Sequence, residues 1–291
     1  DLNKDYLYYI LISEYFQNQK DKYCSGATQK AINNTNLKKI KIPVPPMEIQ
    51  EKIVKVLDEA QALIDKRKEQ IKALDQLIES IFYTMFGDPV RNEKGWEVKE
   101  LGEHIDVLGG YAFKSNEYTD IGIPIIKIGN INRGFFEEKN LCYYEEREDL
   151  NRYIIKPGDL LISLTGTVGK NDYGNLCIID DTFEKYYLNQ RNAKLEILNS
   201  LNKLYLTYLL KTNRLKTELT KNNRGVRQAN ISNDDIKNLR IPIPPISLQN
   251  DFAQKVETIE KQKEVLRESL ELLEENYKSI MDKAFKGQLF N

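Results

Sequence analysis

The sequence has few of the side chains on which most enzyme chemistry depends. Its 291 residues include one histidine, His104, and three widely separated cysteines, Cys24, Cys142 and Cys177. This set is too small for a Cys/His zinc cluster and too scattered for a disulfide framework. The scarcity argues against most histidine-based catalysis, and it favours a cytoplasmic protein over a secreted one. We interpret His104 as an ordinary surface or half-buried residue.

Long apolar runs are also missing from the sequence. A membrane-spanning helix needs a run of about 18 or more apolar residues, and none is present. A basic segment followed by an apolar one, which would mark a signal peptide, is not found either. We therefore expect neither a membrane span nor secretion. Hydrophobic residues still make up 41% of the chain, which is enough for a packed core.

Neither sign of charge predominates in the chain as a whole. The 43 Lys and Arg residues balance 44 Asp and Glu residues, for a net charge of −1, which by itself gives no support for nucleic-acid binding. The charges are unevenly spread, however. Residues 211–240 hold eight basic and three acidic side chains, a net charge of +5. Such a patch can bind phosphates in a neutral chain, although a solvated helical face would also explain it.

Residues 165–170, Thr-Gly-Thr-Val-Gly-Lys, are similar to a phosphate-binding loop. A Walker A motif needs a glycine five residues before its second glycine, and Ser or Thr directly after its lysine. Leu164 and Asn171 occupy those positions, so the segment fails both tests for nucleotide binding. Its glycine-rich backbone and Lys170 remain suited to another phosphate, such as a DNA backbone. No catalytic constellation is found elsewhere, and we predict that the chain is not an enzyme.

The strongest signal in the sequence is an internal repeat at a shift of 199 residues. Residues 26–50 align with residues 225–249 without a gap, and 10 of these 25 positions are identical. A period of this length is far too long for a solenoid, so it indicates a duplicated unit of a domain plus a helix. The globular part of the second copy starts near Trp96, and the equivalent start falls about 100 residues before Asp1. We therefore expect a chain that lacks most of the first globular part.

Each copy is predicted to end in a long helix. Before each Pro-Pro pair, apolar residues alternate as in a short strand, at residues 40–44 and 239–243. After it they recur at spacings of three and four, which predicts helices from about Met47 to Phe86 and from about Leu248 to Phe285. Each helix would span roughly 60 Å and could not bury its apolar stripe alone. Two such helices on duplicated units favour an antiparallel, pseudo-two-fold coiled coil.

The segment between the helices mixes short strands with helix. Strands are predicted at residues 123–128, 160–164, 176–179 and 193–197, and a helix at residues 201–210. This mixture predicts an α+β fold rather than a regular βαβ alternation.

Polar side chains suited to base edges accompany the basic segment. Arg pairs with guanine, and Asn or Gln with adenine, in the major groove of DNA. Each such residue could instead be a turn former or a hydrogen-bonded loop residue. The DNA-facing candidates are Lys170, Arg191, Arg224, Arg227 and Gln228, with Lys127, Asn130 and Arg133 as a second group.

The order and duplication of these segments resemble the specificity subunit of type I restriction–modification systems. The resemblance rests on paired Gly-x-x-Gln and Ile-Pro-x-Pro-Pro-x-x-x-Gln segments, each followed by a long helix, and on Gly158–Ser163 with the loop after it. It implies target-recognition domains joined by two long helices that form an antiparallel coiled coil. The predicted organisation is a remnant of a first target-recognition domain at residues 1–46, long helices at 47–88 and 246–291, and a second recognition domain at 89–245.

The resemblance also implies a function and partners. A specificity subunit of this family reads a half-site of a bipartite double-stranded DNA target with each recognition domain, and it docks two modification (methyltransferase) subunits and the restriction (translocase-nuclease) subunits. It catalyses nothing and holds no cofactor itself, so S-adenosylmethionine and ATP with magnesium are expected on the partners. The alternatives are a half-size or combined-type specificity subunit that acts as a dimer, a non-DNA coiled-coil scaffold, and an enzyme without recognisable motifs.

Overall fold

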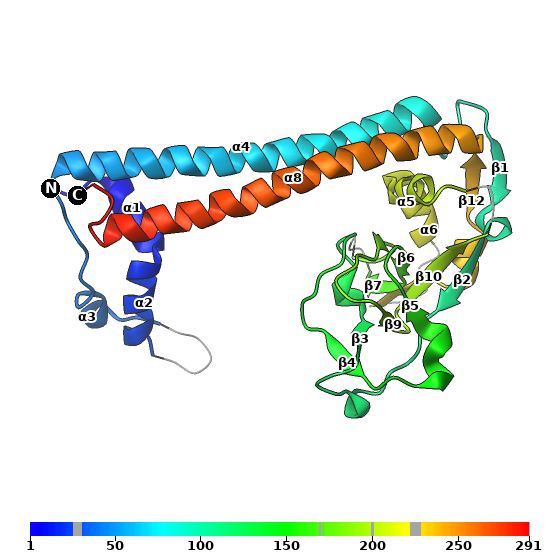
Figure 1. Ribbon diagram of the computed structural model, residues 1–291, viewed down its shortest axis with the longest axis horizontal. Helices are drawn as coiled ribbons and strands as arrows, with labels where there is room; N and C mark the ends of the chain where they lie inside the picture. Colours follow the sequence, from blue (N-terminus) through cyan, green and yellow to red (C-terminus); the bar gives the residue numbers. More distant parts are fainter. Residues whose placement is uncertain (26–30, 169, 171, 199–200, 222–227, 291) are drawn as a thin grey trace. The chain divides into compact units, whose positions relative to one another are not determined.

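The protein is described by a computed structural model that covers residues 1–25, 31–168, 170, 172–198, 201–221 and 228–290 (Figure 1). It forms two compact units. The helical unit consists of Asp1–Leu77 with Ile259–Asn291, and the sheet unit consists of Ile78–Thr258. Within the described residues, no helix has the unbroken apolar stretch that a bilayer crossing would require.

Two long helices, α4 (Met47–Phe86) and α8 (Ile246–Phe285), have 40 residues each. The bounds of α4 are those predicted from the sequence, and α8 begins two residues earlier than predicted. Gly87 and Gly287 follow the helices with φ angles of +78° and +71°, a backbone conformation that favours glycine and ends a helix. The prediction of two long helices is therefore confirmed.

The long helices are antiparallel within the helical unit. Lys68 Nζ lies 2.8 Å from Glu274 Oε1, and Lys263 Nζ lies 2.5 Å from Asp75 Oδ1. Residue numbers thus rise along α4 as they fall along α8. In the sheet unit, the ring of Phe82 meets that of Phe252 with the centroids 5.6 Å apart. The predicted antiparallel coiled coil is confirmed.

Three shorter helices complete the helical unit. Polar side chains start each of them, as is typical of helix N-termini. Asn3 accepts hydrogen bonds from the N–H groups of Asp5 and Tyr6, and Ser13 and Asn33 cap the next two helices in the same way. The helices are α1 (Lys4–Ile12), α2 (Glu14–Tyr23) and α3 (Asn34–Leu37).

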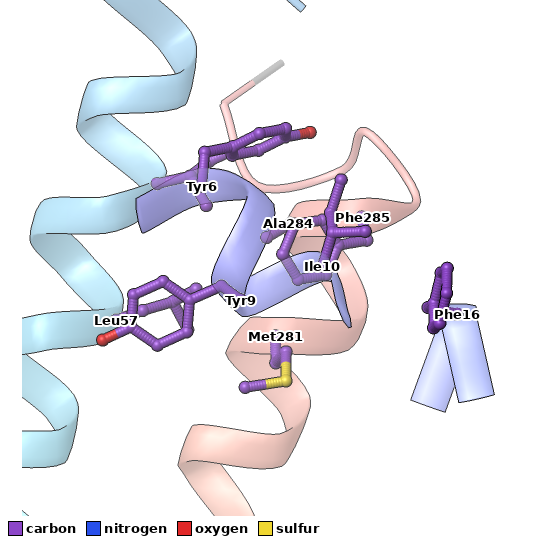
Figure 2. Close-up of a cluster of buried hydrophobic side chains, with 9 residues drawn as sticks. Tyr6, Tyr9, Ile10, Phe16, Leu57, Met281, Ala284 and Phe285 are labelled. Atoms are coloured by element: carbon purple, nitrogen blue, oxygen red, sulfur yellow. The ribbon is translucent and has the colours of Figure 1, made fainter. Parts of the chain in front are cut away.

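The core of the helical unit lies where α1 meets the start of α4 and the end of α8 (Figure 2). The rings of Tyr6 and Phe285 meet edge-on with their centroids 5.6 Å apart. Burying an apolar side chain of this size stabilises a fold by about 1.5 to 3 kcal/mol, so this cluster holds the short helices on the long pair. The buried members are Tyr6, Tyr9, Ile10, Phe16, Ile53, Leu57, Met281, Ala284 and Phe285.

The strands of the sheet unit form four small sheets in the described part of the chain. Their pairings are antiparallel except for β3 with β9. In spatial order, the sheets are β1 (Glu97–Glu100) with β12 (Arg240–Ile243); β2 (Ile105–Gly109), β10 (Asn192–Ile197), β6 (Leu160–Ser163) and β8 (Leu176–Ile178); β11 (Gln228–Asn230) with β7 (Thr165–Thr167); and β4 (Cys142–Tyr144), β3 (Ile123–Ile126), β9 (Tyr186–Leu188) and β5 (Ile154–Ile155).

Helices and single turns surround these sheets, and the α+β prediction is confirmed. The four predicted strands are present as β3, β6, β8 and β10, within two residues of the predicted bounds. The helix predicted at residues 201–210 is α5. The helices are α5 (Lys203–Lys211), α6 (Asn213–Thr220) and α7 (Asn233–Lys237), and the 3₁₀ turns are η1 (Leu101–Glu103), η2 (Ser115–Glu117), η3 (Ile128–Asn130) and η4 (Glu148–Tyr153).

The prediction of a strand at residues 40–44 is wrong, because these residues form no strand. The equivalent segment of the second copy is β12, which pairs along its length with β1. Residues 40–44 have no partner strand among the described residues, and Pro43 removes a backbone donor. A strand exists through pairing with another segment, and alternation along the sequence cannot show whether a partner is present.

The internal repeat is reproduced element by element. Helices α5 to α8 begin 199 residues after α1 to α4, respectively. Gln50 Oε1 accepts a hydrogen bond from Asn3 N–H, and its Nε2 donates to Pro45 O, both at 2.8 Å. Gln249 makes the equivalent bonds to Asn202 and Pro244, also at 2.8 Å. The glutamine of each repeated motif therefore ties a short helix to the start of a long one.

Candidate nucleic-acid interface

Three loops meet at one end of the four-stranded sheet. Because β6 runs antiparallel to both β8 and β10, its last residue lies beside the first residues of those strands. Ser163 is opposite Asn192, and its backbone N–H donates to Asn175 O at 3.0 Å. We call the described residues of the loops at this end, 164–168, 170, 172–175, 189–191 and 127–137, the sheet-end surface.

The first loop carries Lys170 and is braced by a carboxylate. Thr167 donates to Asp172 from its backbone N–H at 2.8 Å and from its hydroxyl at 2.9 Å. A Cβ at Gly166 would lie 2.4 Å from Asp172 Oδ1, so this close approach requires glycine. Burial raises the pKa of Asp172, but the Thr167 hydrogen bonds and the charge of Lys170 outweigh it, and the pKa is lowered. The loop thus holds Lys170 exposed beside the ionised carboxylate of Asp172, which fixes the shape of the loop.

Arg191 lies next to the start of that loop. Its side chain is exposed, and its backbone oxygen accepts a hydrogen bond from Leu164 N–H at 2.8 Å. The backbone of Gln228 pairs with Thr167 on the other side, through β11 and β7. The structure therefore brings the Lys170 loop, Arg191 and the Gln228 backbone together. Arg224, Arg227 and the side chain of Gln228 lie outside the described part of the chain.

The second group of candidates lies on residues 127–137. Lys127 is half-buried, and its Nζ lies 2.9 Å from Cys142 Sγ. Arg133 is exposed and pairs with Glu137 at 2.9 Å. Exposed ion pairs of this kind contribute about 0 to 1 kcal/mol, so Arg133 can exchange its partner for a phosphate at little cost.

Asn130 is placed differently from the other candidates. It is 2% exposed, and its Oδ1 accepts a hydrogen bond from Lys127 N–H at 2.9 Å. Its Nδ2 donates to the backbone oxygens of Glu137 and Lys139 at 2.8 and 2.9 Å. A buried amide whose two ends are both used inside the protein is not available to a base. The structure therefore corrects the prediction for Asn130, which shapes the loop instead of facing DNA.

Asn175, which the sequence did not single out, and Lys216 of the basic segment connect these loops. Asn175 donates from Nδ2 to Asn132 O at 2.5 Å, and its Oδ1 accepts a hydrogen bond from Lys216 Nζ. Burial lowers the pKa of Lys216, and the charge of Asp172 opposes that shift. Lys216 belongs to the basic segment recognised in the sequence, but only the fold shows which loops it reaches.

Neither a metal site nor the single histidine adds to this surface in the described part of the chain. No group of three or more His, Cys, Asp or Glu side chains is placed to hold a metal ion there. His104 is 8% exposed, so it is more buried than expected from the sequence. The chemistry available at the sheet-end surface is positive charge on braced loops, which suits phosphate oxygens and base edges.

Comparison with known proteins identifies the family. The profile described as the type I restriction modification DNA specificity domain matches residues 1–75 and 93–275. The chain belongs to this family. It is 28% identical over 303 residues to the type I restriction enzyme MjaVIII specificity subunit of Methanocaldococcus jannaschii, covering 98% of the chain and 70% of that protein. It is 24% identical over 308 residues to the EcoKI specificity subunit of Escherichia coli, covering 95% and 64%.

Solved structures share the fold. One chain comes from a study of complex assembly and conformational transition of a type I restriction–modification system, with 21% identity, a TM-score of 0.62 and coverage of 98% of this chain and 71% of that one. The specificity subunit from M. genitalium has 16% identity, a TM-score of 0.55 and coverage of 98% and 73%. The prediction of a specificity subunit, rather than a catalytic one, is confirmed by the family.

Proposed function

We propose that this specificity subunit reads one half-site of a bipartite double-stranded DNA target with the sheet-end surface. The observation that carries the proposal is the meeting of Lys170, Arg191 and Arg133, all exposed, at loops around one end of β6, β8 and β10. Lysine suits a phosphate, and arginine suits either a phosphate or the edge of a guanine. Arg224, Arg227 and the side chain of Gln228, which lie outside the described residues, remain candidates for DNA contact from the sequence.

The same proposal assigns roles along the chain. Residues 1–46 form the C-terminal part of a first recognition domain, and residues 89–245 form the second domain. The segments 47–88 and 246–291 contain the two long helices that connect them. Support comes from the repeat, because α1 to α3 match the helices that carry the sheets in the second copy.

The long helices also offer a surface for partner subunits. In the helical unit, Ala73 and Leu74 of α4 line a shallow apolar groove with Val265 and Leu266 of α8. Val265 is 63% exposed, so an apolar side chain of this groove is open to a partner. An apolar groove along two helices suits an amphipathic helix of another protein. We propose that modification and restriction subunits dock on these helices and carry the S-adenosylmethionine and the ATP with magnesium.

This proposal places the protein in the cytoplasm, where those subunits and the DNA would be together. The description of the matched family names DNA specificity. It therefore gives no support to the alternative of a coiled-coil scaffold that does not bind DNA. Nothing observed favours a half-size subunit that acts as a dimer.

The proposal is tested by DNA binding of the full chain with its modification subunit, measured over a range of salt concentrations. Each phosphate contact adds about 0.9 to the slope of log affinity against log salt. We expect Lys170→Ala to weaken binding to all sequences and to reduce the slope by roughly 1. Lys185→Ala is the matched control, because Lys185 precedes β9 and pairs with Glu146 away from the sheet-end surface. A complex without DNA affinity at low salt would contradict the proposal.

A further inference from the structure

The turn that follows β3 is held in a fixed shape. The amide of Asn130 bridges it from inside, and Asn132 O accepts a hydrogen bond from Asn175 Nδ2. Gly134 has a φ of +85°, and its N–H donates to Ile131 O at 3.0 Å. The ring of Phe136 packs on that of Tyr186, with the centroids 5.4 Å apart. The neighbours of residue 135 on both sides are therefore anchored.

Phe135 stands exposed on this anchored turn. Its side chain is 55% exposed, whereas that of Phe136 belongs to the neighbouring core. Exposure of an aromatic ring gives up the free energy that burial would supply, commonly about 1.5 to 3 kcal/mol. A flexible loop could fold such a ring inwards, but this turn keeps it outside. The exposure is thus imposed by the hydrogen bonds and packing of the turn, which leave the ring available to a partner.

Three basic side chains lie near Phe135, together with the acidic Glu137 and Glu138. Arg133 is two residues away with its side chain 67% exposed. Lys211 reaches the same turn, since a Cβ at Gly134 would lie 4.0 Å from its Nζ. Lys216 is joined to the turn through Asn175. An aromatic ring among cations is the combination with which proteins hold nucleic acid, the cations on phosphates and the ring on a base.

Another exposed apolar residue of the sheet unit lacks these neighbours. Ile121 is 84% exposed and precedes β3, whereas Phe135 follows that strand. Its neighbours in sequence include Glu117 and Asp120, which would repel a phosphate. Exposure alone therefore does not single out Phe135; the basic side chains of Arg133, Lys211 and Lys216 near its turn do.

We propose that Phe135 stacks on a base of the bound DNA, as an apolar wedge at one base step, while Arg133 and Lys211 hold the flanking phosphates. This inference rests on the proposed function of the sheet-end surface and adds to it a contact through the face of a base. A ring that enters a base step kinks or unstacks it, so the contact also selects sequences in which that step opens readily.

The test uses the full chain with its modification subunit and fluorescein-labelled duplexes selected from random sequence by the unaltered complex. We expect Phe135→Ala to weaken binding roughly 5- to 150-fold, the usual range for one stacked base. The salt slope should stay unchanged, because no phosphate contact is lost. Phe135→Trp should retain the affinity. Ile121→Ala, the matched control, should bind as the unaltered complex does.

A second measurement reports on the base directly. With 2-aminopurine placed at each position of the selected duplex in turn, the unaltered complex should raise the fluorescence at one step, and Phe135→Ala should abolish that rise. Equal binding and equal fluorescence for Phe135→Ala would overturn the inference while leaving DNA recognition intact. A smaller salt slope for Phe135→Ala would also overturn it, because it would place the residue's role in phosphate contacts. Failure of the proposed function is a separate result, in which the unaltered complex binds no DNA.

Discussion

The two copies of the repeat have the same helical frame but different surroundings. In both, a tyrosine of the first short helix donates its hydroxyl to a proline oxygen of the repeated motif, Tyr6 to Pro43 at 3.0 Å and Tyr205 to Pro242 at 2.8 Å. The same tyrosines pack on the last phenylalanine of a long helix, which is Phe285 for the first copy. For the second it is Phe86, with the ring centroids 4.7 Å apart. Each copy thus closes its core with the end of the other copy's helix.

The surroundings differ because only the second copy carries sheets in the described chain. There α5 packs beside β8 and α7 beside β2. Leu210 is 1% exposed, whereas its counterpart Leu11 is 39% exposed. Ile236 is 0% exposed, whereas Leu37 is 44% exposed. The comparison teaches that the sheets of the second copy form a layer over one face of its helical frame, where they bury Leu210 and Ile236.

Removing a closing phenylalanine should have the largest effect and should act on the opposite copy. Phe86 and Phe285 are each 2% exposed, and replacing such a residue by alanine costs about 3 to 5 kcal/mol. We expect Phe285→Ala to speed amide hydrogen exchange in α1 and at the start of α4. Phe86→Ala should do so in α5 and at the start of α8. Exchange that rises equally in both copies for either variant would break the reciprocal arrangement.

One matched pair of leucines tests whether the sheets cover the helical frame of the second copy only. Leu210→Ala should lower the free energy of unfolding by about 2 to 5 kcal/mol, because it opens a cavity beneath the sheets. Leu11→Ala, at the equivalent exposed position, should change it by less than about 0.5 kcal/mol. Urea denaturation of both variants provides the measurement. Similar losses at the two positions would show that the first copy is covered in solution as the second one is.

The shared frame is tested by the repeated glutamines, with a smaller effect. Gln50 and Gln249 are both 0% exposed and make the same two hydrogen bonds. Substitution by alanine leaves a buried N–H and a buried carbonyl unpaired, at a cost of about 1 to 3 kcal/mol. Thermal unfolding should show comparable losses for Gln50→Ala and Gln249→Ala. A loss confined to one variant would argue that the motif has different roles in the two copies.

The smallest expected effect is the pH dependence of the loop that Asp172 holds in the sheet unit. The folded pKa of Asp172 is lowered, so its brace stabilises the loop at pH values above the ordinary carboxyl range. This stability should be lost as the pH falls through the lowered folded pKa. Nuclear magnetic resonance should show the Thr167 amide shifting with a midpoint below the ordinary aspartate value. Asp172→Asn should abolish that titration, and a midpoint at or above the ordinary value would contradict the brace.

The sequence was sufficient to predict the parts of the fold that depend on residues close together along the chain. Apolar spacings of three and four between Pro46 and Gly87 predicted α4, since a helix depends on neighbours along the chain. The alignment of residues 26–50 with 225–249 predicted a duplicated unit, and Gln50 and Gln249 make equivalent hydrogen bonds in its two copies. The prediction of a strand at residues 40–44 was wrong, because a strand forms only by pairing with a segment that is distant in the sequence.

The candidate interface could be predicted only in part. Lys170 stood out through its glycine-rich loop, and the basic segment stood out through its charge. Asp172 and Asn175 carry no such signal, because their roles arise from bonds to loops that the fold brings together. Asn130 had the residue type of a base reader, but the identity of a side chain does not show its burial.

The most direct test of the central claim is selection of bound duplexes from a random-sequence pool by the chain with its modification subunit. The unaltered complex should enrich one half-site attributable to the sheet unit. Arg191→Ala should lose the preference at one position of that half-site and keep the others, at a cost of about 1 to 3 kcal/mol in binding. Enrichment of the same half-site with the same affinity by both Arg191→Ala and Lys170→Ala would contradict DNA reading by the sheet-end surface.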